Sequence, residues 1–270
     1  MRVAVDSGNN QSVERAAQLL RALADAGHTR VRASDLAAAA GLGLSTASRL
    51  LATLESLDFV ERDPVTSLYR LGPLALLVGG AAANQQPVHR EARQVAQNLA
   101  ARLGLGVNVA RRNGDRLVYL VNAEGQLAPR SFTLLGQTNP LHATGLGKCL
   151  LLGCAAEERR ALLGDGELTA FTAKTVTSLR ALEDELARAR SLGYATEVEE
   201  LALGRACLAA PVRDRDGAVV AAISVSGSLS ALDLPNRRDE LAQLVIETAD
   251  TVSTALGYTA TALHRTKESR

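Results

Sequence analysis

The sequence predicts an α+β protein with two domains, and three observations support this fold class. Residues 34–72 show two short helices joined by a turn and followed by two short strands. After Gly106 the apolar spacing changes to strands mixed with helices, which indicates a sheet with helices packed on its faces. The length of 270 residues allows two domains that each bury a core. We expect a small domain over 1–72, a helical linker over 73–104, an α+β domain over 105–257 and a tail over 258–270.

The small domain is expected to begin with two helices that start at serine N-caps. Apolar spacing predicts the first helix over 12–26, capped by Ser12. A second helix, over 35–40, follows Ser34, whose hydroxyl can accept a backbone N–H that has no partner inside the helix. A glycine-bearing turn at 41–43 then lets the next helix leave at a steep angle, as in a helix-turn-helix.

The third helix, expected over 45–57, has one apolar and one polar face. Its apolar face is formed by Ala47, Leu50, Leu51, Leu54 and Leu57. Near the start of the helix, the polar face carries Ser45, Thr46, Ser48 and Arg49. Because a helix lying in the major groove presents its N-terminal residues to base edges, we expect these four side chains to contact duplex DNA.

Two short strands, expected over 59–62 and 68–71, flank a turn and form a β-wing. Arg62 and Arg70 lie on these strands and are placed to contact phosphates. A helix-turn-helix followed by such a wing is an arrangement that reads double-stranded DNA. The alternative is a small helical hairpin with a purely structural role.

Composition limits the function classes. The net charge is +1, and the first eighty residues hold eight arginines, no lysine and eight acidic residues, so a single DNA-binding domain should bind weakly. With 3% aromatic residues and no Trp, stacking platforms for single strands are not expected. Three cysteines without a CxxC pair and four scattered histidines predict no disulfide, metal or cofactor. Because no charged-then-apolar leader or long apolar run occurs, we expect a soluble, cytoplasmic protein.

The linker is expected to be helical with one break. Pro73 opens a helix over 74–83, residues 84–87 interrupt it, and a second helix runs over 88–103. The alanine-rich first half suits close packing between subunits, and a solvated spacer helix is the alternative.

The α+β domain is expected to contain an antiparallel meander and a closing helix. A hairpin turn at 113–115 joins strands over 107–110 and 116–121, and Ser178 caps a helix that Gly193 ends. The further expected elements are strands over 131–135, 194–199, 206–212 and 218–226, and helices over 145–152, 155–163, 179–192 and 236–256.

In their order and spacing, several motifs resemble the isocitrate-lyase-regulator (IclR) family of bacterial transcription regulators. The resemblance covers residues 12–256 and implies a winged helix joined to a GAF-like effector domain. It also implies a homodimer, usually a dimer of dimers, which would supply several DNA-binding domains. The motifs are SVERA from Ser12, RLLATLE from Arg49, FVERD from Phe59, YRLG from Tyr69, LHATGLGK from Leu141, GYA from Gly193, EE at Glu199, AAPV from Ala209 and SVSG from Ser224.

The resemblance also implies an effector site. Ser224 and Ser226 are two apart on an expected strand, so they face one side, and N–H groups before the helix at Gly145 can hold an anion. These features suit a small organic acid, and Glu197 can accept from a hydroxyl or amine on it. The alternatives are serines bonded to backbone and a Cys207 thiol packed in the core. The implied residues are His142, Ala143, Thr144, Gly145, Glu197, Cys207, Ser224 and Ser226.

The leading interpretation is a ligand-responsive DNA-binding regulator, with two competing functions. A hydrolase-type enzyme would need an orienting acid and a nucleophile turn, but no G-x-S-x-G motif occurs. A redox-responsive regulator would sense through Cys207 or the Cys149/Cys154 pair, which requires a lowered thiol pKa.

Overall fold

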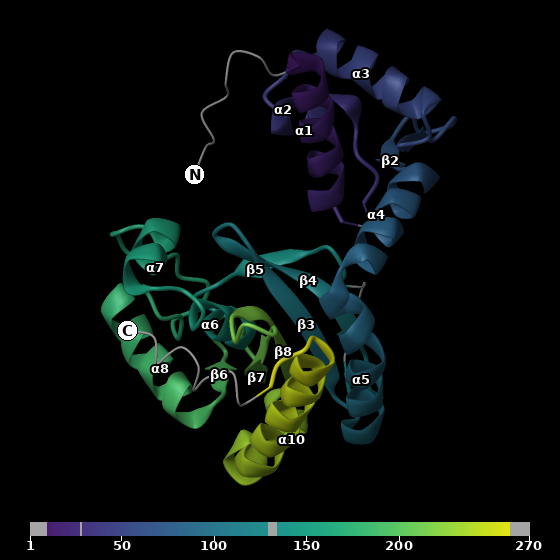
Figure 1. Ribbon diagram of the computed structural model, residues 1–270. Helices are drawn as coiled ribbons and strands as arrows, with labels where there is room; N and C mark the ends of the chain where they lie inside the picture. The colour runs from purple at the N-terminus through teal and green to yellow at the C-terminus, as the bar shows by residue number, and fades with distance from the viewer. Residues whose placement is uncertain (1–9, 28, 129–133, 260–270) are drawn as a thin grey trace. The chain divides into compact units, whose positions relative to one another are not determined.

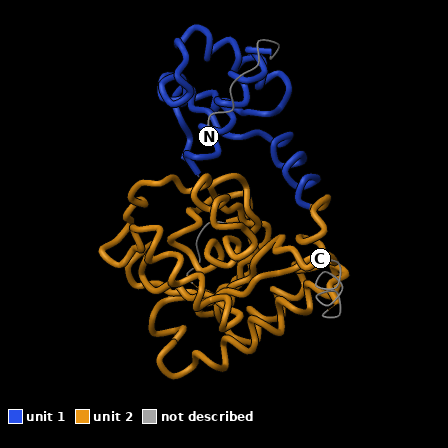
Figure 2. The backbone as a smooth tube through the Cα atoms, turned by 60° about the vertical axis from the view of Figure 1, so that its left-hand side comes forward, with its two compact units in different colours: residues 1–83 blue, residues 84–270 orange. Residues whose placement is uncertain are grey.

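The computed structural model describes residues 10–27, 29–128 and 134–259. The chain divides into two compact units, residues 1–83 and 84–270 (Figure 2). Within the described ranges, no helix is long and apolar enough to cross a membrane.

The first unit contains a three-helix core and a two-stranded wing (Figure 1). Its buried residues come from every element except the last helix, and they include Leu19, Leu36, Leu51 and Val60. Val31 pairs with Tyr69 in an isolated antiparallel β-bridge and so adds a third, one-residue strand to the wing. The elements are α1 (Gln11–Asp25), α2 (Ala33–Ala39), α3 (Leu44–Ser56), β1 (Val60–Arg62), β2 (Tyr69–Leu71) and α4 (Pro73–Gln85).

Both serine N-caps predicted in the first unit are wrong. The N-cap of α1 is Asn10, whose side chain accepts the N–H of Ser12, and asparagine is as good a cap as serine. The N-cap of α2 is Arg32, and Ser34 lies inside the helix. The bridge between Val31 and Tyr69 explains why α2 begins early. It fixes the backbone just before Arg32, whose carbonyl accepts the first helical N–H groups.

The apolar face of α3 is shorter than its periodicity predicts. Ala47, Leu51 and Leu54 are buried, but Leu57 is the C-cap and 53% exposed. Asp58 adopts a left-handed conformation with φ 58°, which turns the chain out of the helix. Phe59 then packs against the core in place of Leu57.

The second unit is a six-stranded antiparallel sheet with helices on both faces (Figure 1). The strand order is β5-β4-β3-β8-β7-β6. The predicted strand over 131–135 lies mainly outside the described residues, whereas β5 and α9 were not predicted. The elements are α5 (Pro87–Leu103), β3 (Gly106–Asn113), β4 (Arg116–Ala123), β5 (Thr138–Pro140), α6 (Gly145–Leu151), α7 (Ala156–Leu163), α8 (Leu179–Leu192), β6 (Ala195–Val198), β7 (Arg205–Arg213), β8 (Val219–Ser228), α9 (Leu229–Leu232) and α10 (Leu234–Ala255).

The two faces of the sheet have different coverings. Helices α5 and α10 pack on one face over large aliphatic side chains such as Val107, Leu208 and Ile223. Helices α6 and α8 pack on the other face, where smaller residues such as Ala209 and Ala222 lie beneath them. The smaller side chains let α6 approach the strands closely.

A β-bulge in β4 decides which side chains face α6. Val109 of β3 pairs with Val121, but the next residue of β3 pairs with Tyr119, so Leu120 is the extra residue. Leu120 and Val121 both join the core beneath α5 and α10. The alternation is thereby reset, and Asn122 lies on the same face as Tyr119.

Candidate functional site

The α6 face of the sheet contains a partly open cavity of about 200 Å³ in the second unit. All six strands and the residue that caps α6 supply its polar side chains, and Leu134, Leu146, Leu201 and Ala202 form part of its apolar wall. The polar lining residues are Asn108, Tyr119, Asn139, Thr144, Glu197, Arg205, Cys207, Ser224 and Ser226.

Five of the eight residues expected at an effector site line this cavity: Thr144, Glu197, Cys207, Ser224 and Ser226. The other three lie outside the lining. Ala143 is fully buried, and the His142 ring packs near Phe171, with Nε2 2.9 Å from the carbonyl of Thr169.

The loop before α6 has few free donors. The N–H of Gly145 faces the Cys207 sulfur, and the N–H of Gly147 donates to Thr144 Oγ1 at 3.0 Å. Thr144 Oγ1 in turn donates to the carbonyl of Pro140. Because these groups already have protein partners and α6 has only seven residues, the loop is a weak anion site.

The strand β8 offers the free hydroxyl groups. Ser224 is 1% exposed, and its Oγ lines the cavity without a hydrogen-bond partner among the described residues. The alternative that both serines bond to backbone therefore fails for Ser224. Ser226 Oγ accepts from Asn108 Nδ2 at 3.0 Å, which leaves the hydroxyl proton of Ser226 available.

Glu197 and Cys207 lie opposite each other on β6 and β7. Glu197 Oε1 accepts the N–H groups of Glu200 at 2.6 Å and Leu201 at 3.2 Å, which orients the carboxyl. Burial raises the pKa of Glu197 above its ordinary value, and these N–H groups oppose the shift. Burial and the nearby carboxyl also raise the pKa of Cys207, so the thiol stays protonated at neutral pH, which disfavours a redox sensor at this position.

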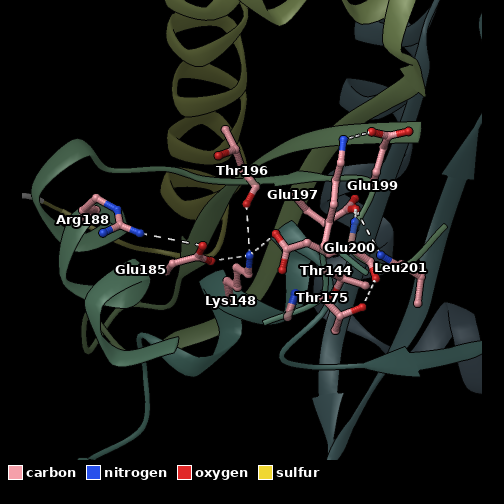
Figure 3. A network of polar contacts seen from close by, with 12 residues as sticks. Thr144, Lys148, Thr175, Glu185, Arg188, Thr196, Glu197, Glu199, Glu200 and Leu201 are labelled. Carbon is pink, nitrogen blue, oxygen red and sulfur yellow. Dashed lines mark hydrogen bonds and ion pairs between the residues drawn. The ribbon is translucent and has the colours of Figure 1, made fainter. Parts of the chain in front are cut away.

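A buried charge cluster lies behind Glu197 (Figure 3). Lys148 of α6 is 1% exposed, and its Nζ lies 2.5 Å from Glu185 Oε2 and 2.5 Å from Glu200 Oε1. Burial by itself lowers the pKa of Lys148, but the two carboxylates together raise it above its ordinary value. Sequence reasoning missed this role, although a lysine among apolar residues of a helix was a usable signal.

Asn108, Asn122, Tyr119 and Asn139 were also missed as members of the site or its surroundings. Asn139 Nδ2 donates to the hydroxyl of Tyr119 at 3.0 Å, and Asn122 Nδ2 donates to Asn108 Oδ1 at 2.9 Å. Asparagine is depleted in strands, so three asparagines on β3, β4 and β5 were the available signal.

In the first unit, the polar face of α3 is open. Ser45, Ser48 and Arg49 are exposed, whereas Thr46 is half-buried. These side chains belong to the first two turns of the helix, where a helix-turn-helix contacts base edges.

The wing arginines have partners within the protein. Arg70 Nε donates to Glu61 Oε2 at 2.6 Å, and the Arg62 guanidinium lies 5.8 Å from the centroid of the Tyr69 ring. Arg30, which was not predicted, forms an ion pair with Asp63 beside them. The wing thus presents three guanidinium groups and two carboxylates on one surface.

A winged helix-turn-helix joined to an α+β domain with a polar cavity defines a transcription regulator with a ligand-binding domain. Residues 12–64 match the IclR helix-turn-helix domain, and residues 80–254 match the domain described as bacterial transcriptional regulator IclR C-terminal. The chain belongs to the IclR family of transcriptional regulators.

Named relatives agree with this assignment. The HTH-type transcriptional repressor AllR of Klebsiella pneumoniae is 38% identical over 92% of this chain and 90% of its own length. The HTH-type transcriptional regulator XynR of Escherichia coli is 34% identical over 93% and 98%. The crystal structure of a regulator from Alicyclobacillus acidocaldarius has 28% identity and a TM-score of 0.82, over 92% of this chain and all of that one. All three are named as transcriptional regulators or repressors.

Proposed function

We propose that this chain is a sequence-specific DNA-binding regulator whose operator binding responds to a small organic acid bound in the cavity of the second unit. The observation that carries the proposal is the Ser224 hydroxyl, which is buried, faces the cavity and has no partner among the described residues. A buried polar group without a partner costs about 1–3 kcal/mol, so a ligand that accepts its hydrogen bond stabilises the complex.

The cavity favours a small ligand with several acceptor atoms. Its volume of about 200 Å³ suits a molecule of a few heavy atoms better than a large planar ring system. Hydroxyl groups of Ser224, Ser226 and Tyr119 line it, and Glu197 lies on the wall beside Cys207. A carboxylate accepts from the hydroxyl groups, while a hydroxyl or amino substituent can donate to Glu197.

DNA contact is assigned to α3 and the wing. Ser45, Thr46, Ser48 and Arg49 would contact base edges, and Arg62 and Arg70 would contact phosphates. Arg49→Ala should lower operator affinity by ~1–3 kcal/mol and relax base preference at one position per half-site. Arg21→Ala, which removes an exposed arginine of α1, is the control. An unchanged footprint and affinity for Arg49→Ala would show that α3 does not read bases.

We propose that the protein forms a homodimer and that two such dimers associate into a dimer of dimers. We also propose that it is located in the cytoplasm. Helix α4 buries none of its residues within the chain, and Leu76 and Leu77 are 79% and 66% exposed. A second copy packed along α4 would remove this apolar surface from water. The proposed assembly would be contradicted if light scattering shows a monomer at micromolar concentration while the protein keeps full operator affinity.

The effector proposal is tested by replacing both β8 serines. In Ser224→Ala/Ser226→Ala the bound carboxylate loses hydrogen bonds worth ~1–3 kcal/mol each, about five- to 150-fold in affinity per hydroxyl. A thermal-shift screen of pyruvate, lactate, glycerate and benzoate identifies the acid on the wild type, and calorimetry measures its affinity for each variant. Ser191→Ala, on the exposed end of α8, is the matched control.

Operator binding without ligand should persist in the double variant. A wild-type response to the acid in Ser224→Ala/Ser226→Ala would place the effector elsewhere. Cys207→Ser tests the redox alternative: loss of the DNA response with acid binding retained would favour a thiol sensor.

A further inference from the structure

At the edge of the cavity, side-chain amides form a hydrogen-bonded chain across three neighbouring strands. The N–H of Leu134 donates to Asn122 Oδ1 at 3.4 Å. Asn122 Nδ2 donates to Asn108 Oδ1 at 2.9 Å, and Asn108 Nδ2 donates to Ser226 Oγ at 3.0 Å. The chain thus runs from a backbone N–H in the segment before β5, through β4 and β3, to the hydroxyl on β8.

The direction of this chain is determined at its first step. A backbone N–H can only donate, so the group that faces Leu134 must be the amide oxygen of Asn122. The NH₂ of Asn122 then faces Asn108, whose oxygen accepts it, and the NH₂ of Asn108 must face Ser226. Ser226 Oγ therefore receives a hydrogen bond from the protein, and its own proton is left to point into the cavity.

A second hydroxyl in the cavity is held in the same way. Asn139 Nδ2 donates to the oxygen of Tyr119, so the phenol proton is also left for the cavity. Burial raises the pKa of Tyr119, which keeps the phenol protonated at neutral pH. With the unpartnered Ser224 hydroxyl, three O–H donors line one wall.

We propose that the Asn122–Asn108 amide chain directs the Ser226 proton away from Asn108 and into the cavity, and that this makes the cavity favour a carboxylate over the matching carboxamide. The inference rests on the proposed function, because it assigns a selectivity mechanism to the same cavity. A carboxylate oxygen only accepts, so it can satisfy every donor on the wall. The NH₂ of a carboxamide cannot accept that O–H. One of the two lone pairs of Ser226 Oγ already holds the Asn108 proton, so the acid fits this position better than the amide.

Asn122 is the position that tests this mechanism, since it does not line the cavity. Asn122→Asp changes the donor NH₂ to an acceptor oxygen with little change of shape. The ionised Asp accepts from both Leu134 and Asn108, so the Asn108 amide turns its oxygen toward Ser226. Ser226 then donates to Asn108, and its proton is withdrawn from the cavity.

The experiment measures affinities of the full-length protein for lactate and lactamide, and for pyruvate and pyruvamide, by calorimetry at pH 8. The wild type should bind the acid at least about a hundredfold more tightly than its amide. In Asn122→Asp the acid should lose at least tenfold in affinity while the amide does not, so the selectivity ratio falls. Operator binding without ligand and the melting temperature report whether each variant is folded.

A double-mutant cycle separates the proposed relay from a general effect of the added charge. In the Ser226→Ala background, Asn122→Asp should have no further effect on acid affinity, because the relay acts only through that hydroxyl. If Asn122→Asp lowers acid affinity as much in the Ser226→Ala background as in the wild type, the added charge acts by long-range repulsion and the proposal is overturned. Asn122→Leu, which adds no charge, should also lower the acid-to-amide ratio, and it replaces Asn122→Asp if that variant does not fold.

The outcomes distinguish this inference from the proposed function. If the wild type binds an acid and Asn122→Asp and Asn122→Leu keep its selectivity, the relay is wrong and the effector site stands. If no acid of the panel binds the wild type while operator binding is intact, both the effector site and the relay fail.

Discussion

The two units of this protein use the same pairing of cation and carboxylate in opposite environments. On the wing, Arg70 and Glu61 form an ion pair whose side chains are 56% and 42% exposed. In the second unit, Lys148 is 1% exposed and lies between Glu185 and Glu200. An exposed pair contributes little to stability and can exchange its partner for a phosphate. A buried cluster cannot lose one member without leaving uncompensated charge, so it holds elements together.

The largest expected effect comes from the buried cluster. Lys148→Met removes the buried cation of the cluster and leaves two carboxylates beside an apolar side chain, which should lower the free energy of unfolding by ~3–5 kcal/mol. Urea unfolding of the isolated protein measures this loss. The control is Lys174→Met, because Lys174 pairs with Glu199 at the surface and should contribute at most about 1 kcal/mol. Equal losses in the free energy of unfolding for the two variants would contradict the difference between the buried cluster and the surface ion pair.

A smaller effect, of opposite sign, is expected on the wing. Glu61→Gln frees Arg70 from its carboxylate partner, so affinity should rise for operator and non-specific DNA alike, by less than about 1 kcal/mol. Arg70→Ala should weaken binding to all sequences and reduce the salt slope by about one. Titrations at several salt concentrations measure both. If Glu61→Gln strengthens binding equally in the Arg70→Ala background, Glu61 acts by repelling DNA rather than by occupying Arg70.

The smallest effect concerns the pH dependence of stability at Glu197. Burial raises its folded-state pKa above the ordinary 4.5, so its contribution to stability is present below that value and is lost as pH rises through the folded pKa. A glutamine side chain at this position does not titrate, so the stability of Glu197→Gln relative to the wild type should increase from about pH 4 upward and then level off. Urea unfolding across this range checks it, and a difference that is constant or falls with pH would contradict the assignment.

Local signals in the sequence predicted the elements that depend on nearby residues. Ser178 caps α8 and Gly193 ends it with φ 81°, as expected, because both devices act within one turn of the helix. The serine caps at 12 and 34 failed for α1 and α2, since a nearby asparagine and a bridge to the wing moved both helix starts. The two-domain α+β fold followed from periodicity that extends over whole elements.

The candidate site was predictable only in part. Ser224 and Ser226 could be placed on one face because strand alternation is local, and Glu197 and Cys207 came from the family resemblance. Nothing local indicated that Asn108 and Asn122 face each other. That pairing depends on strand register and on the bulge at Leu120, which moves Asn122 to the face of the cavity.

The sequence by itself therefore determined the fold class, most elements and the helix-turn-helix, because short-range spacing encodes which face of each element is apolar. Tertiary structure alone decided which polar groups share the interior. Lys148 meets Glu200, and Asn108 meets Ser226, across 52 and 118 residues of chain. Such partners are chosen by the register of paired strands and by the requirement that buried polar groups be satisfied, and both act between segments that are distant in the sequence.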